Sequence, residues 1–214
     1  MQSRNMNPNW AAENLQTIRT LMERSAIYRR ALAPIMLFAG VLGVLVATTG
    51  FLLHLDSMQV FCALWLGTAA VVVAGTFLIA RKQALKDKEA FWSPPTRRVA
   101  QALWPLLLAG MLLGGTPLVI GRGDAPSDCD SLTAIIWILF YGCALHAAGF
   151  FMPRGIKFFG LFFIGCACGL FYAFFANWMP ASVNAHLLMG FFFGALHLAY
   201  GIYLYFTEQK KTVA

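Results

Sequence analysis

Six long apolar stretches constrain the fold of this 214-residue chain more than any other feature. A helix rises about 1.5 Å per residue, so about 20 residues cross the ~30 Å hydrocarbon core of a bilayer. The six stretches have that length, and they lack the alternation and brevity of barrel strands. They run from Ala31 to Leu55, Met58 to Ala80, Val99 to Ile120, Leu132 to Met152, Phe158 to Trp178 and Ala185 to Phe206. The sequence therefore predicts an all-α membrane protein, a bundle of six transmembrane helices.

Composition supports lipid as the solvent of this chain. Hydrophobic residues make up 59% of the sequence and charged residues only 12%, whereas about 25% of the residues in a soluble domain are charged. Such a chain has too little polar surface to coat an apolar core in water, so we expect lipid to cover its apolar surface.

The distribution of lysine and arginine predicts the orientation. Fifteen of the 16 basic residues fall on one side of the predicted spans: in residues 1–30, in the loop 81–98, at Arg154 and Lys157, and in the tail 207–214. Only Arg122 falls on the other side. By the positive-inside rule both termini are cytoplasmic. The net charge of +7 is thus spread over short segments between spans, a pattern that indicates membrane orientation rather than nucleic-acid binding. The expected organisation is a cytoplasmic segment 1–30, a transmembrane domain 31–206 and a cytoplasmic tail.

The segment 1–30 is predicted to form an amphipathic helix, with Asn9 as its cap. Apolar residues repeat there at spacings of three and four, and four arginines lie beside that stripe. The stripe comprises Leu15, Ile18, Met22 and Ala26, and the arginines are Arg19, Arg24, Arg29 and Arg30. We expect the helix to lie on the inner membrane surface. The alternatives are docking against the loop 81–98 or a partner protein, and disorder.

Four segments resemble a family of uncharacterised bacterial six-span membrane proteins. They are ENLQTIRTLMER (Glu13 to Arg24), SPPTRRVAQALWPLLLAG (Ser93 to Gly110), WILFYGCALHAAGFF (Trp137 to Phe151) and GFFFGALHLAYGIYL (Gly190 to Leu204). The resemblance implies the six-span architecture and a location in the bacterial inner membrane. The family has no assigned activity, substrate or cofactor; its members are often encoded near winged-helix regulators, which hints at a regulatory role.

Ionisable groups inside a membrane are candidates for function, because they are costly to place there. No Asp, Glu, Lys or Arg lies deep in a predicted span, which argues against an ion-coupled transporter and a voltage sensor. Four histidines remain: His54 and His186 near the outer surface, and His146 and His197 at similar depths nearer the inner one. Paired histidines on facing helices hold haem b, so these four are candidate haem ligands. The alternative is that each is a hydrogen-bonding group between helices.

Glycines predict where helices pack closely. Pairs four residues apart place two glycines on one helix face, which lets backbones approach in lipid. The pairs are Gly110 and Gly114, Gly165 and Gly169, and Gly190 and Gly194. Gly194, His197 and Gly201 share a face that we interpret as a packing seam, with a ligand groove as the alternative. Cys166 and Cys168 project in different directions from a helix and do not predict a metal site.

The sequence favours a regulatory, sensing or scaffolding role, exercised through the basic segment 1–30 and the loop 81–98. The expected partners are the lipid bilayer and a membrane or cytoplasmic protein. No residue set indicates a catalytic site, so an enzyme is not predicted. The alternatives are a carrier or channel for a small solute, which needs a polar-lined cavity, and a haem b electron-transfer protein.

Overall fold

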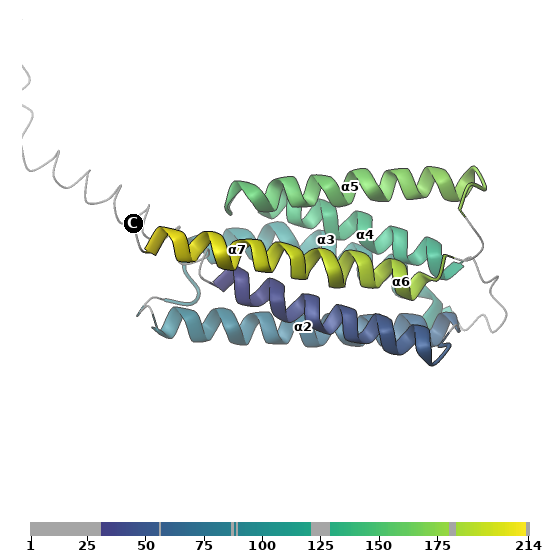
Figure 1. Cartoon of the computed structure of the whole chain (residues 1–214), viewed down its shortest axis with the longest axis horizontal. Coiled ribbons are helices and arrows are strands. Elements are labelled where there is room, and N and C mark those ends of the chain that lie inside the picture. The colour runs from purple at the N-terminus through teal and green to yellow at the C-terminus, as the bar shows by residue number, and fades with distance from the viewer. Residues whose placement is uncertain are drawn as a thin grey trace, which may run out of the picture.

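The computed structural model describes residues 31–55, 57–86, 88, 90–120, 129–179 and 183–212. All regular secondary structure in these ranges is helical, and six helices are long and apolar enough to cross a membrane. The helices lie roughly side by side along one axis (Figure 1). The predicted fold class, an all-α bundle of six such helices, is confirmed. The predicted helix over residues 1–30 lies outside the described residues.

The chain order of the helices follows the predicted spans. The first helix is Ala31–Leu52. It is followed by α2 (Met58–Lys86), α3 (Pro94–Ile120), α4 (Cys129–Ala148) and α5 (Arg154–Phe175). The sixth span is continuous but has three parts, α6 (Ala185–Met189), the π-helical segment η1 (Gly190–Ala195) and α7 (Leu196–Thr212). Because α7 extends to Thr212, part of the predicted tail 207–214 is helical.

Eight of the twelve helix boundaries differ from the predicted spans, by three to six residues, and the differences at the ends of α2 and α4 have a clear physical reason. Helix α2 continues to Lys86 rather than ending at Ala80, because residues such as Lys, Gln, Ala and Leu favour helix even where hydropathy falls. Helix α4 ends at Ala148 rather than Met152. The chain can turn there because Gly149 has no side chain. A Cβ on Gly149 would lie only 2.6 Å from the Lys157 Cα of α5.

Prolines shape the start and the interior of α3. The helix begins at Pro94, five residues before the predicted start at Val99, because proline fits the first helical turn. Pro117 inside the helix has no N–H to donate to the carbonyl of Leu113. The Thr116 hydroxyl donates to that carbonyl instead, at 2.9 Å. The helix therefore keeps this carbonyl bonded in an apolar environment.

Helix α4 is the centre of the bundle. In its most apolar stretch 56% of the residues are buried, against 11% in the corresponding stretches of α2 and α3. It packs most extensively on α5 and then on α3. Helices α2 and α3 consequently expose most of their apolar side chains, which lipid can cover.

The first helix and the sixth span meet along a seam of glycines, and Figure 1 shows the two helices running beside each other. A Cβ on Gly43 would lie 2.5 Å from the Phe193 oxygen, and one on Gly194 would lie 2.8 Å from the Val44 nitrogen. Further along, a Cβ on Gly201 would lie 2.9 Å from the Leu37 nitrogen. The two backbones are in direct contact, which is the arrangement that small residues permit in membranes.

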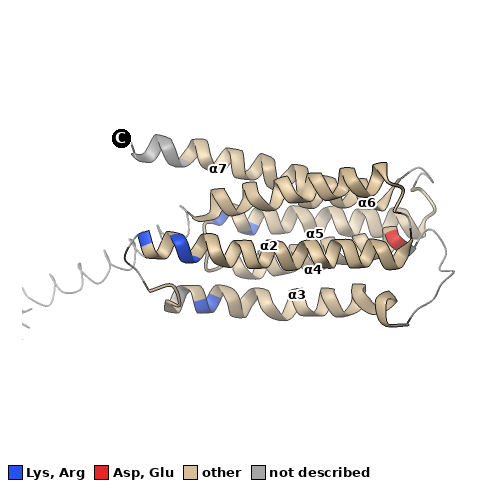
Figure 2. Cartoon of the chain, turned by 90° about the horizontal axis from the view of Figure 1, so that it is seen from below, with Lys and Arg blue, Asp and Glu red and all other residues tan. Residues whose placement is uncertain are grey.

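The described basic residues gather at one end of the bundle. Figure 2 shows basic residues on α2, α3 and α5 at that end, and an acidic residue, Asp130 in the first turn of α4, lies at the other. They are Arg81, Lys82, Lys86, Lys88, Arg97, Arg98, Arg154 and Lys157. The fold thus brings together basic residues that three separate parts of the sequence contribute.

Candidate functional site: two buried histidines

The first of two buried polar centres is formed by His186, which is only 2% exposed. It lies in the first turn of α6, where the Asn184 side-chain oxygen caps the helix by accepting from the His186 backbone N–H at 2.8 Å. Both ring nitrogens have partners. Nδ1 accepts from the Trp65 indole N–H at 3.2 Å, and Nε2 lies 3.1 Å from the Leu55 carbonyl oxygen. An indole nitrogen only donates and a carbonyl only accepts, so the ring is neutral with its proton on Nε2.

Packing fixes the position of the His186 ring. The edge of Phe61 meets it at a centroid distance of 5.1 Å. On the first helix, Gly50 lies against the ring so closely that a Cβ would collide with it. His186 therefore connects the first helix, α2 and α6 at one level of the bundle.

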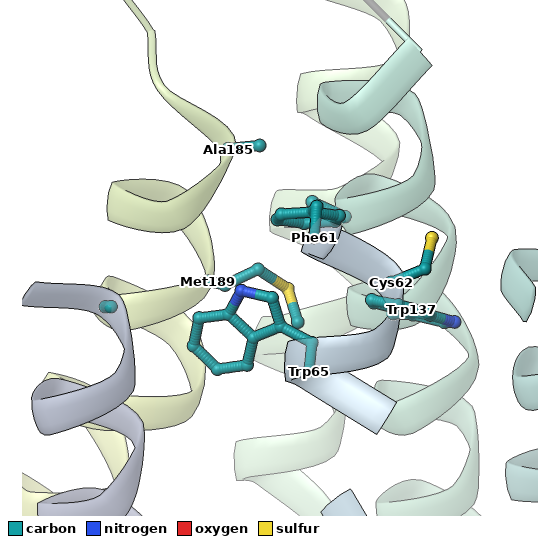
Figure 3. Packing of buried hydrophobic residues seen from close by; sticks show 8 residues of the cluster. Phe61, Cys62, Trp65, Trp137, Ala185 and Met189 are labelled. Carbon is teal, nitrogen blue, oxygen red and sulfur yellow. The ribbon is translucent and has the colours of Figure 1, made fainter. Parts of the chain in front are cut away.

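Around His186 lies an apolar cluster that extends the connection to α3 and α4. Figure 3 shows its side chains, among them Phe61, Trp65, Trp137 and Met189. The rings of Phe61 and Trp137 stack at 5.9 Å. The Trp137 indole donates to the Gly110 carbonyl at 3.0 Å, and a Cβ on Gly114 would collide with the same indole. The polar ends of both tryptophans are thus satisfied within the bundle, as buried indoles require.

The second centre is formed by His197, which is also 2% exposed. Its Nδ1 lies 2.9 Å from the Phe192 carbonyl oxygen, and its Nε2 lies 2.6 Å from the Tyr141 hydroxyl of α4. Since the carbonyl can only accept, Nδ1 carries the proton. For the neutral ring, Tyr141 is then the donor to Nε2. The side chains of Phe159, Phe163 and Phe193 surround the ring at centroid distances of 5.4 to 6.0 Å.

The π-helical segment positions His197. In η1 the Leu196 N–H bonds to the Phe191 oxygen, five residues back, instead of the usual four. The wider turn adds a residue, so α7 is rotated by about 100° relative to a continuous α-helix. As a result Gly194 lies against the first helix, while His197 reaches Tyr141 on α4. Insertions of this kind are frequent at functional sites.

The inner histidines do not share a site. The Nδ1 of His146 lies 3.3 Å from the Lys157 carbonyl oxygen, and its ring meets Phe150 edge-on at 5.4 Å. His146 follows Tyr141 by five residues, which is about 140° around α4. Because Tyr141 faces His197, His146 faces a different direction. His54 lies just beyond the first helix with a φ of 49°.

The two buried histidines do not fit the role of haem ligands in this structure. An axial histidine gives one ring nitrogen to the iron. Both nitrogens of His186 and of His197 are instead bonded to groups of the protein. The observed geometry matches the alternative reading, in which histidines are hydrogen-bonding groups between helices.

Four of the six glycines singled out in the sequence lie at close helix contacts. Gly110 and Gly114 face Phe140 and Trp137 of α4, and Gly190 and Gly194 face Ala47 and Val44 of the first helix. Gly165 and Gly169 on α5 are different, because a Cβ on either would meet no described atom within 4 Å. No described residue packs against these two glycines, so their role in helix packing stays a prediction. Four arginines predicted to contact the membrane or a partner, Arg19, Arg24, Arg29 and Arg30, lie outside the described residues.

Sequence reasoning missed Tyr141 and Trp65, the side-chain partners of the buried histidines. Tryptophan and tyrosine in membrane proteins are usually placed at the interface. Tyr141 and Trp65 lie instead within their helices, each seven residues from the nearer end. A hydroxyl or indole N–H at that depth needs a partner. The sequence therefore indicates that Tyr141 and Trp65 need hydrogen-bond partners, but it does not indicate which residues those partners are.

No family model matches this chain, and comparisons with curated proteins and with solved structures likewise give no match. Fold and sites together define its class. It is an all-α bundle of six helices that are long and apolar enough to cross a membrane, joined by two buried histidine centres.

Proposed function

We propose that the protein is an integral inner-membrane protein with a regulatory, sensing or scaffolding role, and that its basic end is its working surface. The observation that carries the proposal is the gathering of exposed basic residues from α2 and α3 at one end of the bundle. By the positive-inside rule that end faces the cytoplasm. Both termini are then cytoplasmic. The location in a bacterial inner membrane rests on the family resemblance of the sequence.

The interior supports a role based on contact rather than on chemistry. Each buried histidine has one ring nitrogen bonded to a side chain of another helix, Trp65 of α2 for His186 and Tyr141 of α4 for His197. The other ring nitrogen bonds to a backbone carbonyl, that of Leu55 after the first helix or that of Phe192 in the same span. These bonds join the first helix, α2, α4 and the sixth span into one body. A body held in this way presents a fixed arrangement of loops at its ends, which suits recognition by another molecule.

Site-specific crosslinking in cells tests the proposal. A photoreactive residue replaces Lys88, which is exposed at the basic end, and in a matched variant it replaces Trp178, which is exposed at the opposite end. We expect a discrete protein adduct from position 88 and none from position 178. Adducts from position 178 alone, or the same adducts from both positions, would contradict a working surface at the basic end.

A further inference from the structure

Helix α2 is longer than a bilayer is thick. Its 29 residues span about 43 Å, whereas the hydrocarbon core is ~30 Å thick. Counting from Met58, about 20 residues bring the helix to Phe77. The turns that follow Phe77 therefore lie at the level of the lipid headgroups and beyond. They carry three exposed basic residues, Arg81, Lys82 and Lys86.

The connection from α2 to α3 folds back to the level of Phe77. The ring of Phe91 meets Phe77 edge-to-face at a centroid distance of 4.7 Å. Trp92 follows at 6.3 Å from Phe91 and is 60% exposed. Ser93 and Thr96 then fix the start of α3, with their hydroxyl oxygens 2.9 Å apart. An exposed indole is thus held at the depth where tryptophan contacts lipid headgroups.

Further positive charge follows Trp92 along the chain. Arg97 and Arg98 are exposed near the start of α3. The amino-terminal end of a helix carries partial positive charge, which disfavours cations and favours an anion nearby. In sequence the segment 81–98 holds six basic residues and two acidic ones, Asp87 and Glu89, so its net charge is +4. Positive charge remains for an external anion.

We propose that this surface, formed by Arg81, Lys82, Trp92, Arg97 and Arg98, binds the headgroups of anionic phospholipids. The phosphate lies among the arginines and the lysine, and the Trp92 indole lies at the boundary between headgroups and acyl chains. Charge favours an anionic lipid over a zwitterionic one. The cytoplasmic leaflet as the source of the lipid rests on the proposed orientation, whereas the binding itself does not.

Lipid retention by the purified full-length chain tests this inference. Protein in mixed micelles with equal amounts of phosphatidylglycerol and phosphatidylcholine is analysed by native mass spectrometry. The wild-type chain is expected to retain phosphatidylglycerol preferentially, and the preference is expected to fall with added salt. In R97Q/R98Q we expect it to fall at least fivefold, since each basic residue at a membrane surface is worth about fivefold in binding.

The matched control is R154Q/K157Q, which removes two charges from the same end of the bundle but from α5. It is expected to change the preference by less than twofold. If R97Q/R98Q does not fold, R81Q/K82Q replaces it with the same expectation. Equal retention of both lipids by the wild type, or equal losses in the α3 and α5 variants, would overturn the proposal. Because this test uses detergent-solubilised protein, it can succeed where the proposed orientation or protein partner fails.

Discussion

At the scale of single residues, the pair of Tyr141 and His197 shows how this chain places a polar group in an apolar interior. Each atom that needs a partner has one: the Tyr141 hydroxyl, the two ring nitrogens and the Phe192 carbonyl. The unpaired alternative is costly where water is excluded. The pair therefore specifies how α4 and α7 meet.

Removal of one partner tests this pair. In Tyr141→Phe the Nε2 atom of His197 loses its donor, so we expect the free energy of unfolding to fall by about 1 kcal/mol. His197→Phe should cost at least as much, because it also removes the bond to the Phe192 carbonyl. Unfolding in mixed detergent micelles measures both variants.

Tyr172→Phe is the control, since Tyr172 is 63% exposed on α5, and it should change the unfolding free energy by a few tenths of a kcal/mol at most. The double variant should cost less than the sum of the single ones, and full additivity would contradict a direct bond.

Gly50 provides a second test at the residue scale, because its lack of a side chain makes room for the His186 ring. Gly50→Ala should destabilise the bundle by about 1–3 kcal/mol through overpacking. In a His186→Ala background the same substitution should cost little, because the obstructing ring is gone. Gly67→Ala serves as the control, since a Cβ there meets no described atom within 4 Å. Thermal unfolding in detergent is the measurement, and an equal cost of Gly50→Ala in both backgrounds would refute the contact.

At the scale of elements, the seam between the first helix and the sixth span is a close backbone contact with glycines on both sides. It depends on η1, because the π-helical turn sets which residues of the sixth span face the first helix. The sequence did not predict this turn. A π-helical insertion follows from the packing of neighbouring helices rather than from the local preferences of Gly, Phe and Ala.

Two leucine substitutions separate seam glycines from lipid-facing ones. Gly194→Leu should lower the unfolding temperature strongly, because a Cβ at this position already approaches the Val44 nitrogen to 2.8 Å. Gly165→Leu adds the same side chain to α5, where a Cβ would meet no described atom within 4 Å. This variant should keep its unfolding temperature within a few degrees of the wild type. Monomeric protein in detergent is the sample for both. Similar losses in the two variants would show that α5 packs there as well.

Helix α2 shows what hydropathy can and cannot predict about an element. The apolar stretch that ends near Ala80 was predicted, because the thickness of a bilayer fixes the minimum length of a span. The continuation of the helix to Lys86 was not, because it depends on helix-favouring polar residues outside the hydrocarbon. The contact between Phe91 and Phe77 could not be predicted either, because it depends on how the loop between α2 and α3 folds.

At the scale of the whole molecule, the architecture could be predicted and the candidate site only in part. Six spans follow from apolar length alone, and the depths of the histidines follow from residue counts. Their partners do not follow, because a sequence gives the depth of a residue in a membrane but not which helices are neighbours. His146 and His197 illustrate the difference: they were predicted at similar depths, yet one bonds to Lys157 and the other to Tyr141.

The central claim is that all six helices cross a membrane with the basic end inside. Cysteine labelling in intact cells tests it most directly. In a background with the five native cysteines replaced by alanine, single cysteines are introduced as Lys88→Cys and as Asp124→Cys, and treated with a membrane-impermeant maleimide. We predict labelling at position 124 in intact cells and at position 88 only after the membrane is opened. Labelling of both positions from the same side would contradict the account.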